Sequence, residues 1–196
     1  PTEDPFQGET AFLQAALHLP DPNDPEHRSL IDVEVCPVTG IGEKSLDDYA
    51  AVIMANVAEC PPSLGEGLKT FVRAEGKGLI IFLGANVQPE SYNRALFEQA
   101  GLLPGRIGAQ FVEAPEGGVN IGTAELSHPI VSFFSDKDNQ HFVTKPRFRK
   151  YYPIEMPQQD DEATKGDAID RAGVVARFTD GQPAIAERCV GRGSVL

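Results

Sequence analysis

The sequence predicts an α/β fold with a mostly parallel sheet and a β-rich C-terminal part. Two short, continuous apolar runs, at 51–55 and 79–83, are typical of strands covered on both faces of a parallel sheet. Each run is followed by a segment whose apolar residues recur at helical spacing, at 63–76 and 90–100. This succession of strand, helix, strand and helix is what βαβ units produce. From about Gly105 onward Gly and Pro become denser, and short strands are expected instead.

Before the first apolar run, a helix, a loop and a strand are expected. Thr10–Leu19 carries four apolar residues at helical spacing, and the proline that follows ends the pattern. Pro20–Arg28 is polar and interrupted by prolines, which predicts a loop. Leu30–Val35 alternates apolar and acidic residues, as a half-buried strand does.

The two helices that follow the apolar runs have recognisable ends. Ser63 is a candidate N-cap, and Glu66 stands three positions later, which is the spacing of a capping box. The apolar stripe of this helix ends at Gly76. The second helix, Glu90–Ala100, is followed by Gly101 as its C-terminal stop.

The C-terminal part is expected to consist of short strands joined by turns. An acidic and polar loop or hairpin tip is expected at Gln158–Asp170, and a turn at Gly191–Gly193 before a final strand. The strands are expected at 109–112, 151–154, 173–178, 184–189 and 194–196.

An excess of acidic residues excludes some classes of function. The 196 residues, enough for one domain or two small ones, include 17 Lys and Arg against 29 Asp and Glu, a net charge of −12. Binding of nucleic-acid phosphates needs a concentrated basic surface, and the only basic run is Lys145–Lys150. No nucleic-acid partner is therefore predicted. The 41% of hydrophobic residues excludes a wholly disordered chain.

The sequence contains no apolar run long enough to cross a bilayer, which takes roughly 20 residues. It begins at Pro1 without a Met or a secretory signal, so we expect a piece of a longer protein whose membrane segments lie outside these residues. Cys36 and Cys60 each precede a proline and are expected to be buried or half-buried thiols, and Cys189 is expected to pack in the core. The histidines lack metal-ligand spacing, so neither a metal nor a cofactor is predicted.

A ligand site is expected at the carboxyl ends of the two apolar strands, because ligands bind at that edge of open parallel sheets. Asn56 follows the first strand, and Asn86 follows the second. Gln88 and Tyr92 lead into the next helix, and His128 stands before a proline further on. The alternative is structural: Asn often closes a turn through its own backbone, and a residue before proline adopts extended geometry.

No catalytic residue is predicted. A nucleophile on a sharp strand-to-helix turn would fall at Gly84-Ala85-Asn86, where the central residue is alanine. A methyl group cannot attack a carbonyl, and the sequence contains no GxSxG or GxCxG motif.

Two blocks, Leu46–Val57 and Leu68–Gly84, resemble the pattern L-x-x-Y-D-x-V-x-L-A-N-V … L-x-x-F-V-x-x-G-G-G-L-x-x-F-x-G of class I glutamine amidotransferase-like domains. Within that superfamily the chain is most similar to the domain of bacterial membrane-anchored proteins that carry a von Willebrand factor A module (the BatA-type, double-transmembrane group). Further matches lie at Tyr92-Asn93, Gly101-Leu102-Leu103-Pro104, His128-Pro129-Ile130 and Gly191-Arg192-Gly193, so the resemblance covers roughly Asp4 to Leu196.

The resemblance implies a single three-layer, flavodoxin-like domain over 1–196 without the amidotransferase machinery, since the nucleophilic Cys of the family would fall near Ala85. Lys77 replaces the middle glycine of the family's Gly-Gly-Gly turn. The first strand of such folds is expected just before Thr2–Gly8, outside these residues.

The leading hypothesis is a non-catalytic interaction or ligand-sensing domain on the extracytoplasmic (periplasmic) side of a bacterial membrane protein, with a protein or a small polar ligand as its partner. The alternative is a sugar-binding or hydrolytic domain similar to the trehalose-utilisation (ThuA-like) branch, with the ligand held by Asn56, Asn86, Gln88, Tyr92 and His128. A flavin protein is the third possibility, and it is the least favoured because the first strands are not followed by a phosphate-binding loop.

Overall fold

The computed structural model describes residues 10–18, 20–21, 23–122, 126, 128–157 and 170–196. The chain divides into two compact units, residues 1–45 and 46–196. Each unit is described by itself.

In the first unit the N-terminal helix is confirmed. Helix α1 spans Ala11–Leu17 and buries none of its residues; the Phe12 side chain is 69% exposed. The predicted loop after it is wrong, because β1 (Pro20–Asp21) and β2 (Asp24–Ser29) form an antiparallel hairpin there. Proline fixes φ near an extended value and is tolerated in strands that lie at an edge, which a two-stranded hairpin provides on both sides.

The strand predicted at Leu30–Val35 does not form. The backbone there is irregular, and the side chains of Leu30, Ile31 and Val35 are exposed. An alternating pattern states which face a strand would bury, but a strand also needs a neighbour that accepts its hydrogen bonds. The described part of the chain provides no such neighbour for this segment. A 3₁₀ helix, η1 (Val38–Glu43), follows.

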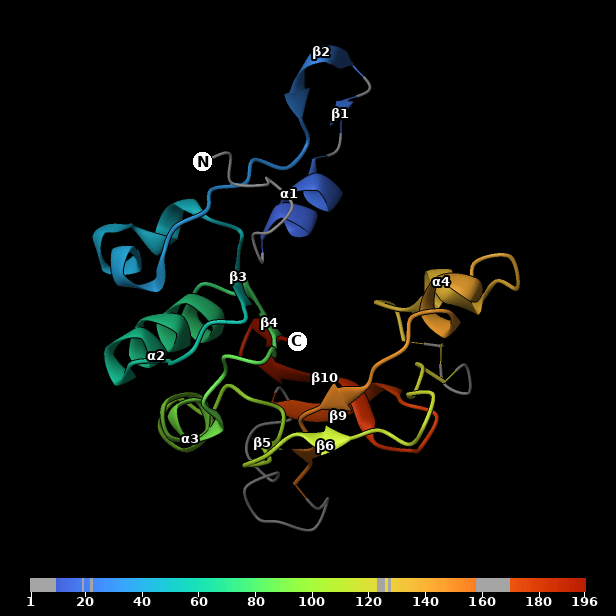
Figure 1. Ribbon diagram of the computed structural model, residues 1–196. Coiled ribbons are helices and arrows are strands. Elements are labelled where there is room, and N and C mark those ends of the chain that lie inside the picture. The colour runs from blue at the N-terminus through green and yellow to red at the C-terminus, as the bar shows by residue number, and fades with distance from the viewer. Residues whose placement is uncertain (1–9, 19, 22, 123–125, 127, 158–169) are drawn as a thin grey trace, which may run out of the picture. The chain divides into compact units, whose positions relative to one another are not determined.

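The second unit contains a five-stranded mixed sheet (Figure 1). Its strands lie in the order β3-β4-β11-β10-β9. The pairs β3–β4 and β4–β11 are parallel, and the pairs β11–β10 and β10–β9 are antiparallel. The fold is therefore mixed α/β, with parallel strands at one end of the sheet and antiparallel strands at the other. The strands span Ala51–Ala55 (β3), Gly78–Phe82 (β4), Arg171–Arg177 (β9), Pro183–Val190 (β10) and Gly193–Val195 (β11).

One helix connects β3 to β4, a second follows β4, and the two lie side by side (Figure 1). Helix α2 (Pro62–Lys69) continues as a π-helical segment, η3 (Thr70–Ala74), and α3 (Pro89–Tyr92) continues likewise as η4 (Asn93–Gln99). A short 3₁₀ helix, η2 (Leu46–Asp48), precedes β3.

The predicted ends of these helices are partly confirmed. Gly76 and Gly101 follow them in the left-handed conformation, with φ of +76° and +65°. The predicted capping box at Ser63 is wrong, because Pro61 occupies the N-cap and Pro62 the first helical position. The fixed φ of proline suits that position, where its missing N–H would have no partner in the helix.

The main apolar core lies between these helices and one face of the sheet. Val52 and Met54 of β3, with Leu79 and Ile81 of β4, point into it. The side chains that fill it from the helical side include Leu68, Phe71, Val72, Tyr92 and Leu96. On the opposite face the Phe82 side chain is 49% exposed. The prediction that both faces of β3 and β4 are covered is therefore wrong for the described residues.

The late strands β9, β10 and β11 are confirmed within one or two residues of the predicted positions. The strand predicted at 109–112 forms only at its last residue, and the strand predicted at 151–154 is split in two. In their place, β5 (Arg106–Ile107) pairs with β8 (Ile154–Glu155), and β6 (Val112–Glu113) pairs with β7 (Lys150–Tyr151). Pro153, which has no N–H to donate, separates β7 from β8.

The other elements of this part are η5 (Ser132–Ser135) and α4 (His141–Thr144). The acidic loop predicted at Gln158–Asp170 lies outside the described residues except for Asp170. None of the helices formed by described residues has the length and hydrophobicity that spanning a bilayer requires.

Candidate functional site

The carboxyl ends of β3 and β4 lie next to each other, and Asn56 and Asn86 lie there together. The Asn56 N–H donates to the Phe82 carbonyl oxygen (3.0 Å), and its side-chain Oδ1 accepts the Asn86 N–H (2.9 Å). Asn56 has a φ of +49°, in the left-handed region that asparagine tolerates. A Cβ on Gly84 would lie 2.4 Å from the Asn56 Oδ1, so the asparagine side chain fills the space at that glycine. The Asn56 amide thus closes the turn after β4.

Gln88 and Tyr92 also lie at this edge, but they do not form an open crevice. The Gln88 N–H donates to the Ala58 carbonyl oxygen (2.8 Å), and its side chain is exposed. Tyr92 is fully buried, and its hydroxyl donates to the Val57 carbonyl oxygen (2.7 Å). Burial raises the pKa of the Tyr92 hydroxyl, so it stays protonated and keeps this bond. Tyr92 therefore ties α3 to the segment that leaves β3.

The neighbour of Tyr92 has a similar structural role, which the sequence did not suggest. Asn93 is buried, its Nδ2 donates to the Ile107 carbonyl oxygen (2.7 Å), and its Oδ1 accepts the Ile107 N–H (2.8 Å). Both polar groups of the amide are satisfied by one residue of β5. This pair holds the helix against the chain that follows it.

A small cavity of about 270 Å³ opens between the starts of α2 and α3. The Ser91 Oγ accepts the Cys60 N–H (3.0 Å) and donates to the Cys60 carbonyl oxygen (3.1 Å). Exposed Arg94 and Glu59 contribute charged groups to its rim. The residues that line it are Glu59, Cys60, Pro61, Pro62, Ser91, Arg94 and Ala95. No pattern in the sequence pointed to these residues as a site. Glu59–Pro62 lead from β3 into α2, and the other three lie in α3 and η4.

The thiols do not provide an activated nucleophile at this edge. Ala85 is exposed at the tip of the turn after β4. Cys60 is buried, as predicted, and burial raises the pKa of its thiol to about 11, so the thiol is protonated at neutral pH. Cys36 and Cys189 are exposed, so the predictions that Cys36 is at least half-buried and that Cys189 packs in the core are wrong.

His128 lies against β10, away from the other candidate residues. Its Nε2 is 3.1 Å from the Glu187 Oε2, and its Nδ1 accepts the Ile130 N–H at 3.4 Å. Both ring nitrogens are thus engaged within the chain, Nε2 by the Glu187 carboxylate and Nδ1 by a backbone N–H. Cys189 stands two residues beyond Glu187, and partial desolvation together with the Glu187 carboxylate raises the pKa of its thiol. Of the five predicted residues, four lie at the carboxyl edge and His128 does not join them.

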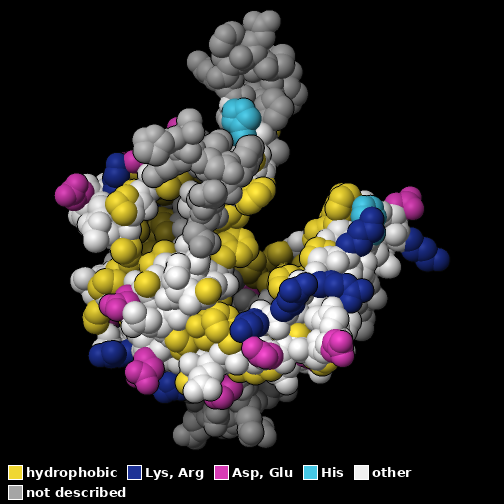
Figure 2. All heavy atoms as spheres, viewed as in Figure 1, with side chains coloured by type: hydrophobic (Ala, Val, Ile, Leu, Met, Phe, Trp, Pro, Cys, Tyr) yellow, Lys and Arg dark blue, Asp and Glu magenta, His cyan; other side chains and the backbone are white. Residues whose placement is uncertain are grey.

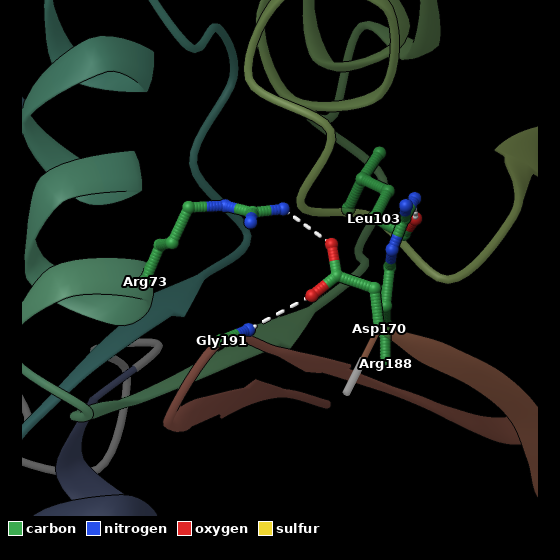
Figure 3. A network of polar contacts seen from close by, with 5 residues as sticks. All are labelled: Arg73, Leu103, Asp170, Arg188 and Gly191. Atoms are coloured by element: carbon green, nitrogen blue, oxygen red, sulfur yellow. Dashed lines mark hydrogen bonds and ion pairs between the residues drawn. The ribbon is translucent and has the colours of Figure 1, made fainter. Parts of the chain in front are cut away.

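A second polar cluster lies at the opposite, amino-terminal edge of β4 and β11 (Figure 3). The Asp170 carboxylate pairs with the Arg73 guanidinium and accepts the Gly191 N–H (2.9 Å). Arg188 reaches the Leu103 carbonyl oxygen (3.3 Å), and burial lowers the pKa of its guanidinium. The carboxylate thus links the end of α2–η3 to the turn between β10 and β11, which is a structural role.

Among the described residues, His, Cys, Asp and Glu do not gather in any group of three or more that could hold a metal ion. Comparison of the sequence with protein-family models and with curated proteins finds no match.

Proposed function

We propose that this chain is a non-catalytic interaction or ligand-sensing domain of a larger bacterial membrane protein, on the extracytoplasmic side. The hydrogen bonds at the carboxyl edge of the sheet are the observation that supports a non-catalytic domain. Asn56, Tyr92 and Ser91 direct their polar groups to the chain's own backbone. The position that would present a nucleophile is Ala85. A catalytic site needs polar groups aimed at a substrate, not consumed in closing turns.

The membrane-protein context rests on the resemblance to class I glutamine amidotransferase-like domains of BatA-type proteins. The net charge of −12 supports it, because an acidic surface keeps a domain soluble and repels anionic lipid headgroups. The same resemblance supports a three-layer, flavodoxin-like arrangement. Ile53, Ile80 and Phe82 share the face of β3 and β4 opposite the helices, and a further layer would bury this apolar surface.

The test of the non-catalytic assignment is an assay for hydrolysis of glutamine and of activated esters, with the Asn86→Ala variant as its control. We expect no turnover by either protein. Hydrolysis by the unchanged chain that Asn86→Ala abolishes would overturn the proposal.

For the location, alkaline phosphatase fused after Leu196 in the full-length protein should be active, since this reporter works only outside the cytoplasm. An inactive fusion that is expressed at a normal level contradicts the extracytoplasmic assignment.

The 270 Å³ cavity favours a second candidate, a domain that binds a small polar ligand or a sugar. Arg94 and Glu59 would supply hydrogen bonds and charge. Its volume lies just below the roughly 300–1,000 Å³ typical of ligand pockets, so only a small ligand fits. A sugar or polyol that binds should raise the Tm by a few degrees at saturation, and Arg94→Gln should remove this shift. A flat screen of such ligands contradicts this candidate.

A further inference from the structure

A groove with a basic wall lies on this acidic protein, at a distance in sequence from the residues discussed above. Figure 2 shows Lys and Arg side chains gathered in one band, with acidic side chains beside it. The segment Lys145–Lys150 contains four cations and no acidic residue, in a chain with a net charge of −12. All four of these cations, Lys145, Arg147, Arg149 and Lys150, are exposed. Such a local reversal of charge marks a surface suited to an anionic partner.

The fold anchors this basic segment at Phe148, which forms an antiparallel bridge, and the backbone bends at Arg149. Phe148 and Val119 exchange both backbone hydrogen bonds, at 2.8 and 2.9 Å. The Phe148 ring packs on the Phe178 ring with centroids 5.2 Å apart, inside a buried cluster. Arg147 and Arg149 flank this inward Phe148 in the sequence, and both are exposed. Both arginines line the same groove.

We define the basic groove as the cleft between Glu113–Gly118 and the side chains of Arg147, Arg149 and Lys150. Its volume is about 510 Å³, which is within the range of roughly 300–1,000 Å³ seen for ligand pockets. The loop that forms its other wall is pressed against the basic segment. A Cβ on Gly118, whose φ is +79°, would lie 3.0 Å from the Phe148 carbonyl oxygen. The two walls of the groove are therefore in direct contact at Gly118 and Phe148.

The cationic side chains of the groove differ in the hydrogen bonds and ion pairs that they form with the chain itself. The Arg147 Nη1 donates to the Gly117 carbonyl oxygen (2.7 Å), and the Lys150 Nζ lies 3.0 Å from the Glu113 Oε1. Among the described residues, no acceptor bonds to the Arg149 guanidinium. Arg149 thus offers a planar set of donors that fits a carboxylate in two parallel hydrogen bonds.

The charges of the other wall decide which polyanion fits. Glu113 and Glu116 line the groove opposite the arginines. A nucleic acid or an anionic bilayer presents negative charge throughout and would be repelled by these carboxylates. An extended polypeptide can place acidic side chains on one side and neutral ones on the other.

We propose that the basic groove binds an extended acidic segment of a partner protein, with carboxylates of that segment on Arg147 and Arg149. This inference rests on the proposed function as an interaction domain, and it names the surface and the chemistry of the partner.

The experiment measures binding of a fluorescein-labelled peptide, in which Glu and Thr alternate, by fluorescence anisotropy with the full 196-residue chain. The matched peptide has Gln in place of every Glu. We expect the Glu peptide to bind, the Gln peptide not to bind, and the affinity to fall as salt is raised toward about 150 mM. Equal binding of the two peptides, or no binding of the Glu peptide at low salt, would overturn the proposal.

The groove variant is Arg147→Gln with Arg149→Gln, and the charge-matched control is Lys137→Gln with Arg171→Gln, both exposed and outside the groove. Loss of the two arginines should weaken peptide binding by roughly tenfold or more. The control should change it by less than about twofold. Arg149→Gln alone guards against misfolding of the double variant, because it breaks no described contact. Equal losses in groove and control variants contradict the proposal, since they would report net charge alone.

Two further arms separate the partner classes and the two proposals. Single-stranded DNA or phosphatidylglycerol vesicles that bind more tightly than the Glu peptide, and lose binding in the groove variant, would overturn the choice of a polypeptide. Failure of the non-catalytic assignment appears separately, as hydrolysis in the assay described above. Absence of peptide binding without hydrolysis overturns only the groove.

Discussion

Lys77 joins three parts of the second unit. It stands where the domains that this chain resembles have the middle glycine of a turn. Its Nζ donates to the Asp47 carbonyl oxygen (2.7 Å) and to the Leu46 carbonyl oxygen (3.2 Å). It also lies 2.8 Å from the Glu75 Oε2 and 5.0 Å from the centroid of the Phe71 ring. The lysine therefore fastens the turn before β4 to the segment that leads into β3.

The ion pair between Glu75 and Lys77 should make the folded protein less stable at acid pH than at neutral pH. The hydrogen bond from Lys77 lowers the pKa of the Glu75 carboxyl below its usual range. The pair therefore stabilises the fold above the unfolded pKa of about 4.3, and this contribution is lost as the pH falls through the lower folded pKa. We expect Glu75→Gln to have a lower Tm than the unchanged protein at neutral pH, and the difference to shrink in acid.

Thermal unfolding followed from neutral pH down to about pH 3 checks this expectation. The control is Glu66→Gln, because Glu66 is exposed and lies 3.8 Å from Lys69. A Tm difference for Glu75→Gln that stays constant across the range would contradict the assignment of the shift to this carboxyl.

The three thiols should differ in reactivity. Cys36 and Cys189 are exposed, whereas Cys60 is buried and has a pKa raised to about 11. Since the thiolate is the reactive form, two thiols should react with Ellman's reagent in the native protein, and the third only after unfolding. The raised pKa of Cys189 should make it the slower of the two. In a variant with Cys36→Ser and Cys189→Ser, rapid reaction of the native protein would contradict the burial of Cys60.

Among the elements, the turn between β10 and β11 packs closely against the end of η3. Gly191 has a φ of +59°, and a Cβ there would lie 2.6 Å from the Arg73 carbonyl oxygen. We expect Gly191→Ala to destabilise the protein by about 2–4 kcal/mol, from backbone strain together with the clash. Urea unfolding measures this loss.

Gly181→Ala is the matched control for this substitution. Gly181 also has a positive φ, +89°, but nothing lies within 4 Å of its Cβ position. It should cost about 1 kcal/mol, from strain alone. Equal losses in the two variants would show that the close approach of Arg73 to Gly191 does not matter.

Local patterns predicted the elements that local interactions determine. The apolar runs of β3 and β4 and the glycine stops at Gly76 and Gly101 could be predicted because each depends on a few adjacent residues. The strand expected at Leu30–Val35 failed because alternation cannot supply a partner strand. The placement of Asn56 beside Asn86 followed from the parallel order of the strands, whereas the use of its amide in a turn needed the atomic positions.

Pairings between distant residues could not be predicted from the sequence. Asp170 and Arg73 are 97 positions apart, and neither has a pattern that points to the other. His128 stands before a proline, which suggested a turn, but its contact with Glu187 depends on where β10 lies in the sheet. The basic groove was visible only as the run Lys145–Lys150, because its second wall comes from a loop about 30 residues earlier.

On the scale of the whole molecule, the second unit contains the apolar clusters that the structure describes. All three are formed by residues between 46 and 196. We expect a protein that begins at Leu46 to fold by itself, because burial of apolar surface supplies most of the stabilisation of a domain. A single cooperative transition in urea, with a near-ultraviolet circular dichroism spectrum of packed aromatic rings, is the expected result. A non-cooperative transition would contradict it.

The position of β11 constrains how the protein is made. This strand lies between β4 and β10, yet it is formed by Gly193–Val195, far later in the chain than β4. During translation the β3–β4 pair and the β9–β10 hairpin both emerge from the ribosome before the strand that joins them. Until then each half presents an open strand edge, which is where nascent chains associate wrongly. Protection of these edges during synthesis, for instance by a chaperone, would therefore raise the yield of correctly folded protein.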